Sequence, residues 1–259
     1  MASTALMTRI FPLLLTAATL ALVCPVFAEP HPWTETTKVT IVDGKKGQLT
    51  HLDFPDLPND LIAVQATVNI EHAVPTGLNF FAIQVDFPNK TWAHGGPQFN
   101  NGKDKVVNWG GLVDRGGGSA DYEKANPAAD LYLIQCDPGG ENSKPYDWEQ
   151  NQPLKIAIHR GKQVTLPAGD YRMDGKVIHI GKLRTMWEWH LTVSPQKGTG
   201  KVYRATIHNT ADRFSSFCVW NESGYGSEHK GQRATWSDVA YKSLSKPRKM
   251  VRPEKFERS

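Results

Sequence analysis

The chain has 259 residues, of which 39% are hydrophobic and 22% are charged, and its formal net charge is +4. A chain of this length suits a single all-β domain with a core large enough to fold without disulfide support. The positive charge lies in residues 241–259, where seven Lys or Arg stand against two Glu, so the body of the chain is close to neutral. This charge distribution argues against a dedicated nucleic-acid-binding protein.

Residues 1–28 have the layout of a secretory signal peptide. An apolar stretch over residues 10–23 follows a short positive region, and Val26 and Ala28 occupy the small-residue cleavage positions. The stretch contains Pro12 and is too short for a membrane span, and no later segment is apolar enough to cross a bilayer. We therefore predict a secreted or periplasmic protein without a transmembrane segment.

The remaining chain divides by composition into three parts. Residues 29–37 are rich in proline and predict a linker, and residues 38–240 predict one domain. Residues 241–259 are basic, contain two prolines and have few apolar side chains, which predicts a disordered tail.

Alternating side chains predict β-strands throughout the domain. Residues 61–71 place Ile62, Val64, Ala66, Val68 and Ile70 on one face, and residues 78–87 place Phe80, Ala82, Gln84 and Asp86 opposite an apolar face. Residues 234–243 predict a short helical turn. Further strands are predicted at residues 38–42, 105–113, 131–136, 154–159, 163–166, 170–173, 176–180, 184–193, 202–207 and 214–220.

Many short strands separated by Gly, Pro and Asn predict an all-β fold. No repeat of 20–50 residues is present, which argues against a propeller or a β-helix. We therefore expect a single antiparallel β-sandwich of jelly-roll type with disordered termini.

The predicted strand over residues 184–193 carries two contrasting faces. Trp187 and Trp189 share the face expected in the core, whereas Glu188 and His190 share the other. The carboxylate and the imidazole then lie about 6.5–7 Å apart along the strand. This pair is a candidate ligand surface or catalytic pair, or simply a solvated polar face.

Three tryptophans lie in polar or glycine-rich segments, unlike a typical core tryptophan. These are Trp92, Trp109 and Trp148. Sugar sites combine an aromatic platform with a few polar groups that bind hydroxyls. The candidate ligand-binding residues are therefore Gln84, Asp86, Trp92, Trp109, Trp148, Glu188 and His190.

Other chemistries leave weaker signals. The nine histidines are scattered without a metal-binding spacing, and no serine-nucleophile motif is present, so we predict no transition-metal cofactor. Calcium is an alternative, since loop carboxylates are available at Asp114, Asp121, Asp130, Asp137 and Glu141. In an oxidising compartment, Cys136 and Cys218 are candidates for a disulfide, and two buried thiols are the alternative.

Several short motifs follow one another along the chain: Phe80-Phe-Ala-Ile-Gln-Val85, Gly95-Gly96, Val107-Asn-Trp109, Gly139-Gly-Glu141, Tyr146-Asp-Trp148 and Trp187-Glu-Trp189. Their order resembles an uncharacterised family of secreted bacterial and fungal β-sandwich domains. More distantly, the layout is similar to the concanavalin A-like lectin and glucanase sandwiches. The distant resemblance implies extracellular carbohydrate binding by analogy of fold alone.

Three functions remain open from the sequence. The first is a secreted sandwich that binds carbohydrate or a cell-surface glycan, which we favour. The second is a polysaccharide-cleaving lyase or glycosidase that uses Glu188 and His190 together with Gln84 and Asp86. The third is a structural or interaction protein without a small ligand. The sequence does not decide whether the protein is an enzyme, nor its oligomeric state.

Overall fold

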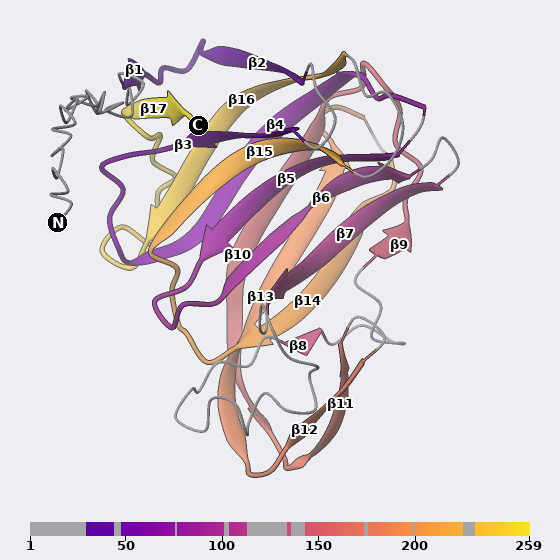
Figure 1. Cartoon of the computed structure of the whole chain (residues 1–259). Coiled ribbons are helices and arrows are strands. Elements are labelled where there is room, and N and C mark those ends of the chain that lie inside the picture. Colours follow the sequence, from indigo (N-terminus) through magenta and orange to yellow (C-terminus); the bar gives the residue numbers. More distant parts are fainter. Residues whose placement is uncertain are drawn as a thin grey trace, which may run out of the picture.

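The protein folds as two antiparallel sheets packed face to face, which confirms the predicted all-β sandwich (Figure 1). The computed structural model describes residues 30–43, 48–75, 77–100, 104–112, 134–135, 143–173, 176–198, 200–224 and 231–259. The predicted signal peptide lies outside the described residues. The jelly-roll connectivity within the sandwich stays a prediction.

The first sheet has eight strands in the order β1-β17-β3-β15-β5-β6-β7-β9. Their bounds are β1 His31–Pro32, β17 Lys255–Arg258, β3 Gln48–Asp53, β15 Ser216–Gly224, β5 Leu78–Asp86, β6 Trp92–Asn100, β7 Asp104–Leu112 and β9 Ser143–Pro145. Strands β15, β5, β6 and β7 lie toward the viewer in Figure 1, with the second sheet behind them.

The second sheet has seven strands in the order β2-β16-β4-β10-β13-β14-β8. Their bounds are β2 Lys38–Asp43, β16 Gln232–Ser243, β4 Leu61–His72, β10 Leu154–Leu166, β13 Arg184–Pro195, β14 Tyr203–Asn209 and β8 Ile134–Gln135. The hairpin formed by β11 Gly169–Met173 and β12 Lys176–Ile180 extends beyond the sandwich at the bottom of Figure 1.

The core fills the space between the sheets with apolar side chains from alternate strand positions. The predicted inward face of residues 78–87 is confirmed, since Phe81, Ile83 and Val85 are fully buried. A buried polar contact joins the two sheets across the core: the Trp236 Nε1–H of β16 donates to Asn221 Oδ1 of β15 at 2.9 Å. This hydrogen bond ties the register of β15 to the opposite sheet.

Strand β13 only partly matches its predicted faces. Trp189 is buried as expected, but Trp187 is half-buried and stacks with the Arg160 guanidinium, 4.4 Å from the ring centre. Met186, expected on the polar face, is fully buried. The pairing of β10 with β13 shifts between Arg160 and Gln163. The extra residue lies on β10, and the shift stands opposite Trp187–Trp189, so the regular pairing of β13 is interrupted at the point where its faces depart from the prediction.

The predicted disordered tail is wrong, because residues 241–259 contribute to both sheets. Tyr241 continues β16 and exchanges two backbone hydrogen bonds with Val251, and β17 pairs with β3 and β1. Phe256 packs edge-on against Trp33, which is itself buried. The tail is therefore held by backbone pairing and by an aromatic contact to the segment predicted as an N-terminal linker.

The predicted helical turn at residues 234–243 is also wrong, because this segment is strand β16. Its pairing with β4 is irregular between Ser237 and Ala240, and Asp238 adopts a positive φ of 54°. This bulge places Val239 and Ala240 in the core as neighbours. Consecutive buried residues of this kind resemble a helical pattern in the sequence.

Candidate functional site

The outer face of the eight-stranded sheet gathers polar and aromatic side chains from its four central strands. Their neighbours in each strand point into the core, so alternation turns these side chains outward. The outward residues are His51 and Asp53 of β3, Cys218, Trp220 and Glu222 of β15, Phe80, Ala82, Gln84 and Asp86 of β5, and Trp92, His94 and Gln98 of β6. We call this surface the β15 face.

Aromatic rings form the middle of the β15 face. Phe80 lies edge-on to both Trp220 and His94, with ring centres 5.0 and 5.1 Å apart, and His94 contacts Trp92 at 4.8 Å. Burial lowers the pKa of His94 to about 4, so this imidazole is neutral at pH 7. Trp220 is only 4% exposed, whereas Trp92 is half-buried and leaves part of its ring accessible.

Carboxylates lie on the same strands as these rings. Strands β3, β15, β5 and β6 contain no Lys or Arg in the residues described, yet they carry Asp53, Asp86 and Glu222. Asp86 accepts hydrogen bonds from Gln84 Nε2 at 3.0 Å and from Ser216 Oγ at 2.9 Å, one on each oxygen. The face is therefore acidic, and the Asp86 carboxylate is held in a fixed orientation.

Glu222 differs from the other two carboxylates. It lies between Leu49 and Phe80 on the neighbouring strands, and burial raises its pKa. No hydrogen bond or ion pair joins the Glu222 carboxyl to another residue in the described part of the chain. A carboxyl in such surroundings holds its proton more readily than a solvated one, which suits a proton donor.

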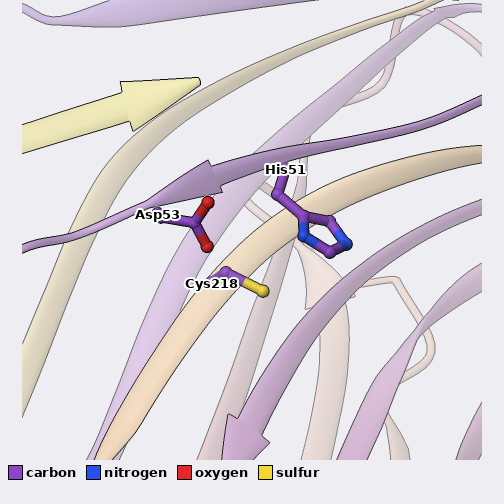
Figure 2. A group of neighbouring side chains, drawn as sticks. All are labelled: His51, Asp53 and Cys218. Atoms are coloured by element: carbon purple, nitrogen blue, oxygen red, sulfur yellow. The ribbon is translucent and has the colours of Figure 1, made fainter. Parts of the chain in front are cut away.

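Cys218 lies at one end of the β15 face, directly between Asp53 and Gln84. Burial, together with the charges of Asp53 and Asp86, holds the pKa of its thiol well above the usual range. The donor atoms of His51, Asp53 and Cys218 lie within 4.8 Å of one another (Figure 2). These three residue types are all metal ligands in proteins.

The structure brings three of the predicted ligand residues together. Gln84 and Asp86 are hydrogen-bonded to each other, and Trp92 stands opposite Asp86 in the ladder of β5 and β6. All three belong to the β15 face.

Trp109 and Trp148 are core residues, so the prediction that they form an exposed platform is wrong. Their side chains are 0% and 1% exposed. A Cβ added to Gly95 would lie 2.7 Å from a Trp109 ring atom. Glycine near this tryptophan therefore makes room for a buried indole ring and does not indicate an exposed one.

Glu188 and His190 lie on the outer face of the seven-stranded sheet, on the far side of the sandwich from Gln84 and Asp86. The predicted site that joined all four residues is therefore wrong. His190 Nε2 lies 3.5 Å from the Glu188 carboxylate, and its Nδ1 is hydrogen-bonded to Thr206 at 2.8 Å. The two predicted residues do contact each other.

A shallow cavity of about 220 Å³ lies beside this pair, lined in part by His159, His190 and Arg204. The His159 and His190 rings are 5.1 Å apart. Burial, and then the charges of His190 and Lys242, lower the pKa of His159. Burial also lowers the pKa of His208, with the Glu188 charge opposing that shift. The cluster thus combines histidines whose charged forms are disfavoured by burial with the charged side chains of Arg204 and Glu188.

Two predictions concern residues outside the described part of the chain. The calcium-binding loop residues all lie there, so calcium binding stays a prediction. Cys136 also lies there, while Cys218 is a buried free thiol. The structure therefore does not show the predicted Cys136–Cys218 disulfide.

No family model and no curated protein matches the chain. Among solved structures it is similar to Scytalido-glutamic peptidase bound to a peptide-based transition state analog, at 9% identity and a TM-score of 0.40, over 82% of this chain and 84% of that one. A second similar structure is SCP-B, a member of the eqolisin family of peptidases in complex with a tripeptide, with the same identity and coverage and a TM-score of 0.39. Likeness at this distance carries no argument about function.

Within the described residues, no helix has both the length and the apolar character needed to span a membrane.

Proposed function

We propose that this protein binds a glycan chain across the β15 face. The observation that carries the proposal is the grouping of Trp92, Asp86 and Gln84. The accessible part of the Trp92 ring offers an apolar surface for the C–H face of a sugar. Beside it, Gln84 and Asp86 are fixed by their own hydrogen bonds and provide groups for sugar hydroxyls.

The charge of the face limits which glycans fit. The four central strands carry three carboxyls and neither Lys nor Arg in the described residues. A sulfated or uronic-acid chain would meet like charges, which disfavours binding. Neutral sugars and amino sugars are therefore the proposed ligand class.

Isothermal titration with neutral oligosaccharides chosen from a glycan array tests the proposal. We expect Trp92→Ala to weaken binding by at least tenfold, because it removes the stacking surface. Trp187→Ala is the matched control, since Trp187 is also half-buried but belongs to β13 in the other sheet. Equal affinity of Trp92→Ala and the wild-type protein would overturn the proposal, as would an array on which no neutral glycan or amino sugar binds.

A second candidate function is cleavage of the bound chain, with Glu222 as proton donor. The raised pKa of this carboxyl on the proposed ligand face favours it. Release of reducing ends by the wild-type protein, lost in Glu222→Gln while binding persists, would support cleavage. Binding without cleavage in the wild-type protein would exclude it for the glycans tested. If neither occurs, an interaction protein without a small ligand is the better account.

Secretion is part of the proposal and has its own test. Residues 1–28 carry the signal-peptide pattern described above. We expect the mature protein to begin at Glu29, which N-terminal sequencing of the exported protein can establish. An exported protein that retains residues 1–28 would contradict this.

A further inference from the structure

Three potential metal ligands meet at one end of the β15 face (Figure 2). His51 and Asp53 are two residues apart on β3, so alternation directs both side chains outward. Cys218 is the register partner of Asp53 on β15. Two ligands from one strand and a third from its neighbour therefore converge without any loop.

The spacing of the donor atoms is close to what a tetrahedral zinc ion requires. Zinc–ligand bonds of about 2.0–2.3 Å at tetrahedral angles set the ligand atoms roughly 3.3–3.7 Å apart. The His51, Asp53 and Cys218 donors already lie within 4.8 Å of one another. A zinc ion at this place therefore requires the donor atoms to approach by about 1–1.5 Å at most, a movement on the scale of side-chain rotation.

The surroundings hold two of these residues in place. The hydroxyl of Ser259 donates to Asp53 Oδ2 at 2.6 Å, which leaves Oδ1 for a metal. Ser259 also exchanges both backbone hydrogen bonds with His51, at 3.0 and 3.2 Å. Hydrogen bonds that orient ligands in this way are the usual second layer of a metal site.

The electrostatic setting favours a cation. Strands β3 and β15 contain no Lys or Arg, and Glu257 of β17 stands opposite Asp53. Within the described residues no hydrogen bond reaches either ring nitrogen of His51, so the imidazole is available as a ligand. Cys218 is a free thiol.

We propose that His51, Asp53 and Cys218 form a zinc site with one open coordination position. A nitrogen, an oxygen and a sulfur donor together suit zinc, and calcium or magnesium would instead need oxygen ligands. Three protein ligands leave the fourth position to water or to a group bound on the β15 face. The proposal goes beyond glycan binding and does not depend on it.

Titration of the reduced full-length chain with Zn²⁺, and separately with Co²⁺, tests this site. We expect one equivalent of either metal to bind, and bound cobalt to show a thiolate-to-cobalt charge-transfer band. Cys218→Ser should remove that band and weaken zinc binding by at least tenfold. A non-thiol reductant keeps Cys218 from forming the predicted disulfide with Cys136.

Two further variants keep the test decisive if Cys218→Ser unfolds the protein, as judged by circular dichroism. His51→Asn and Asp53→Asn should each weaken zinc binding by at least tenfold. His72→Asn is the control, because His72 is an exposed histidine at the end of β4. The proposal is overturned if the wild-type protein binds no zinc, or if cobalt binds without the thiolate band. It is also overturned if the ligand variants bind like the control.

Discussion

The hydrogen bond between Trp236 and Asn221 predicts a measurable coupling across the core. Both residues are fully buried, and the bond length is 2.9 Å. Asn221 lies between Trp220 and Glu222 on β15, so the bond fixes the strand that supplies the centre of the β15 face. Breaking the bond should therefore cost stability and loosen that face.

The magnitude follows from the groups left without partners. Trp236→Phe leaves Asn221 Oδ1 unsatisfied at about 1–3 kcal/mol, and the smaller ring adds roughly 1 kcal/mol for the void. Asn221→Leu leaves the Trp236 N–H unsatisfied but removes the Asn221 Nδ2, which is buried without a partner among the described residues. Its net cost is therefore smaller, about 0–2 kcal/mol.

Equilibrium urea unfolding, followed by circular dichroism, measures both single variants and the double variant. The double variant removes every polar atom of the pair, so it should be about 1–2 kcal/mol more stable than the sum of the two single changes predicts. Additive effects, within about 0.5 kcal/mol, would refute the idea that this bond couples the sheets.

Three other outcomes follow from the fold. Phe256→Ala should lower the free energy of unfolding by about 1–3 kcal/mol, because the ring packs on Trp33. An unchanged free energy of unfolding would instead favour a disordered tail. Burial raises the pKa of Asp43 from 3.8 to about 6, so the folded state binds the proton more tightly and stability falls as pH rises through this interval. Asp43→Asn should flatten that fall in urea unfolding across pH 4–7, and an unchanged slope would contradict the assignment. Gly161→Ala should shift the His190 imidazole signals in NMR spectra, since the added Cβ would clash with His190 Nε2. Unchanged signals would contradict the close approach of the two residues.

Strand periodicity predicts much of the sandwich because each sheet has one buried face. The alternation over residues 78–87 matches β5, including the outward placement of Gln84 and Asp86. In β4 the predicted inward face holds from Val64 to Ile70, but Leu61 is buried in place of Ile62. Alternation fails at bulges, where a residue is inserted and later side chains change face. The bulge near Asp238 accounts for the predicted helix in β16, and the mispredicted Trp187 of β13 stands opposite the irregularity of β10 near Gly161.

Most of the candidate site depends on pairing that local patterns cannot reveal. His51 and Asp53 lie on a strand that the sequence did not predict, and Cys218 reaches them only through the register of β15. The alternation of His51, Leu52 and Asp53 is a signal that could have found this strand. Trp92 is half-buried on β6, and its partners depend on contacts between residues distant in the chain.

Chemical-shift mapping with a neutral oligosaccharide tests the central claim most directly. We predict that the perturbed amides cluster on β5, β6 and β15, together with the indole N–H of Trp92. Perturbation confined to β10, β13 and β14 would place the ligand on the opposite sheet and contradict this account.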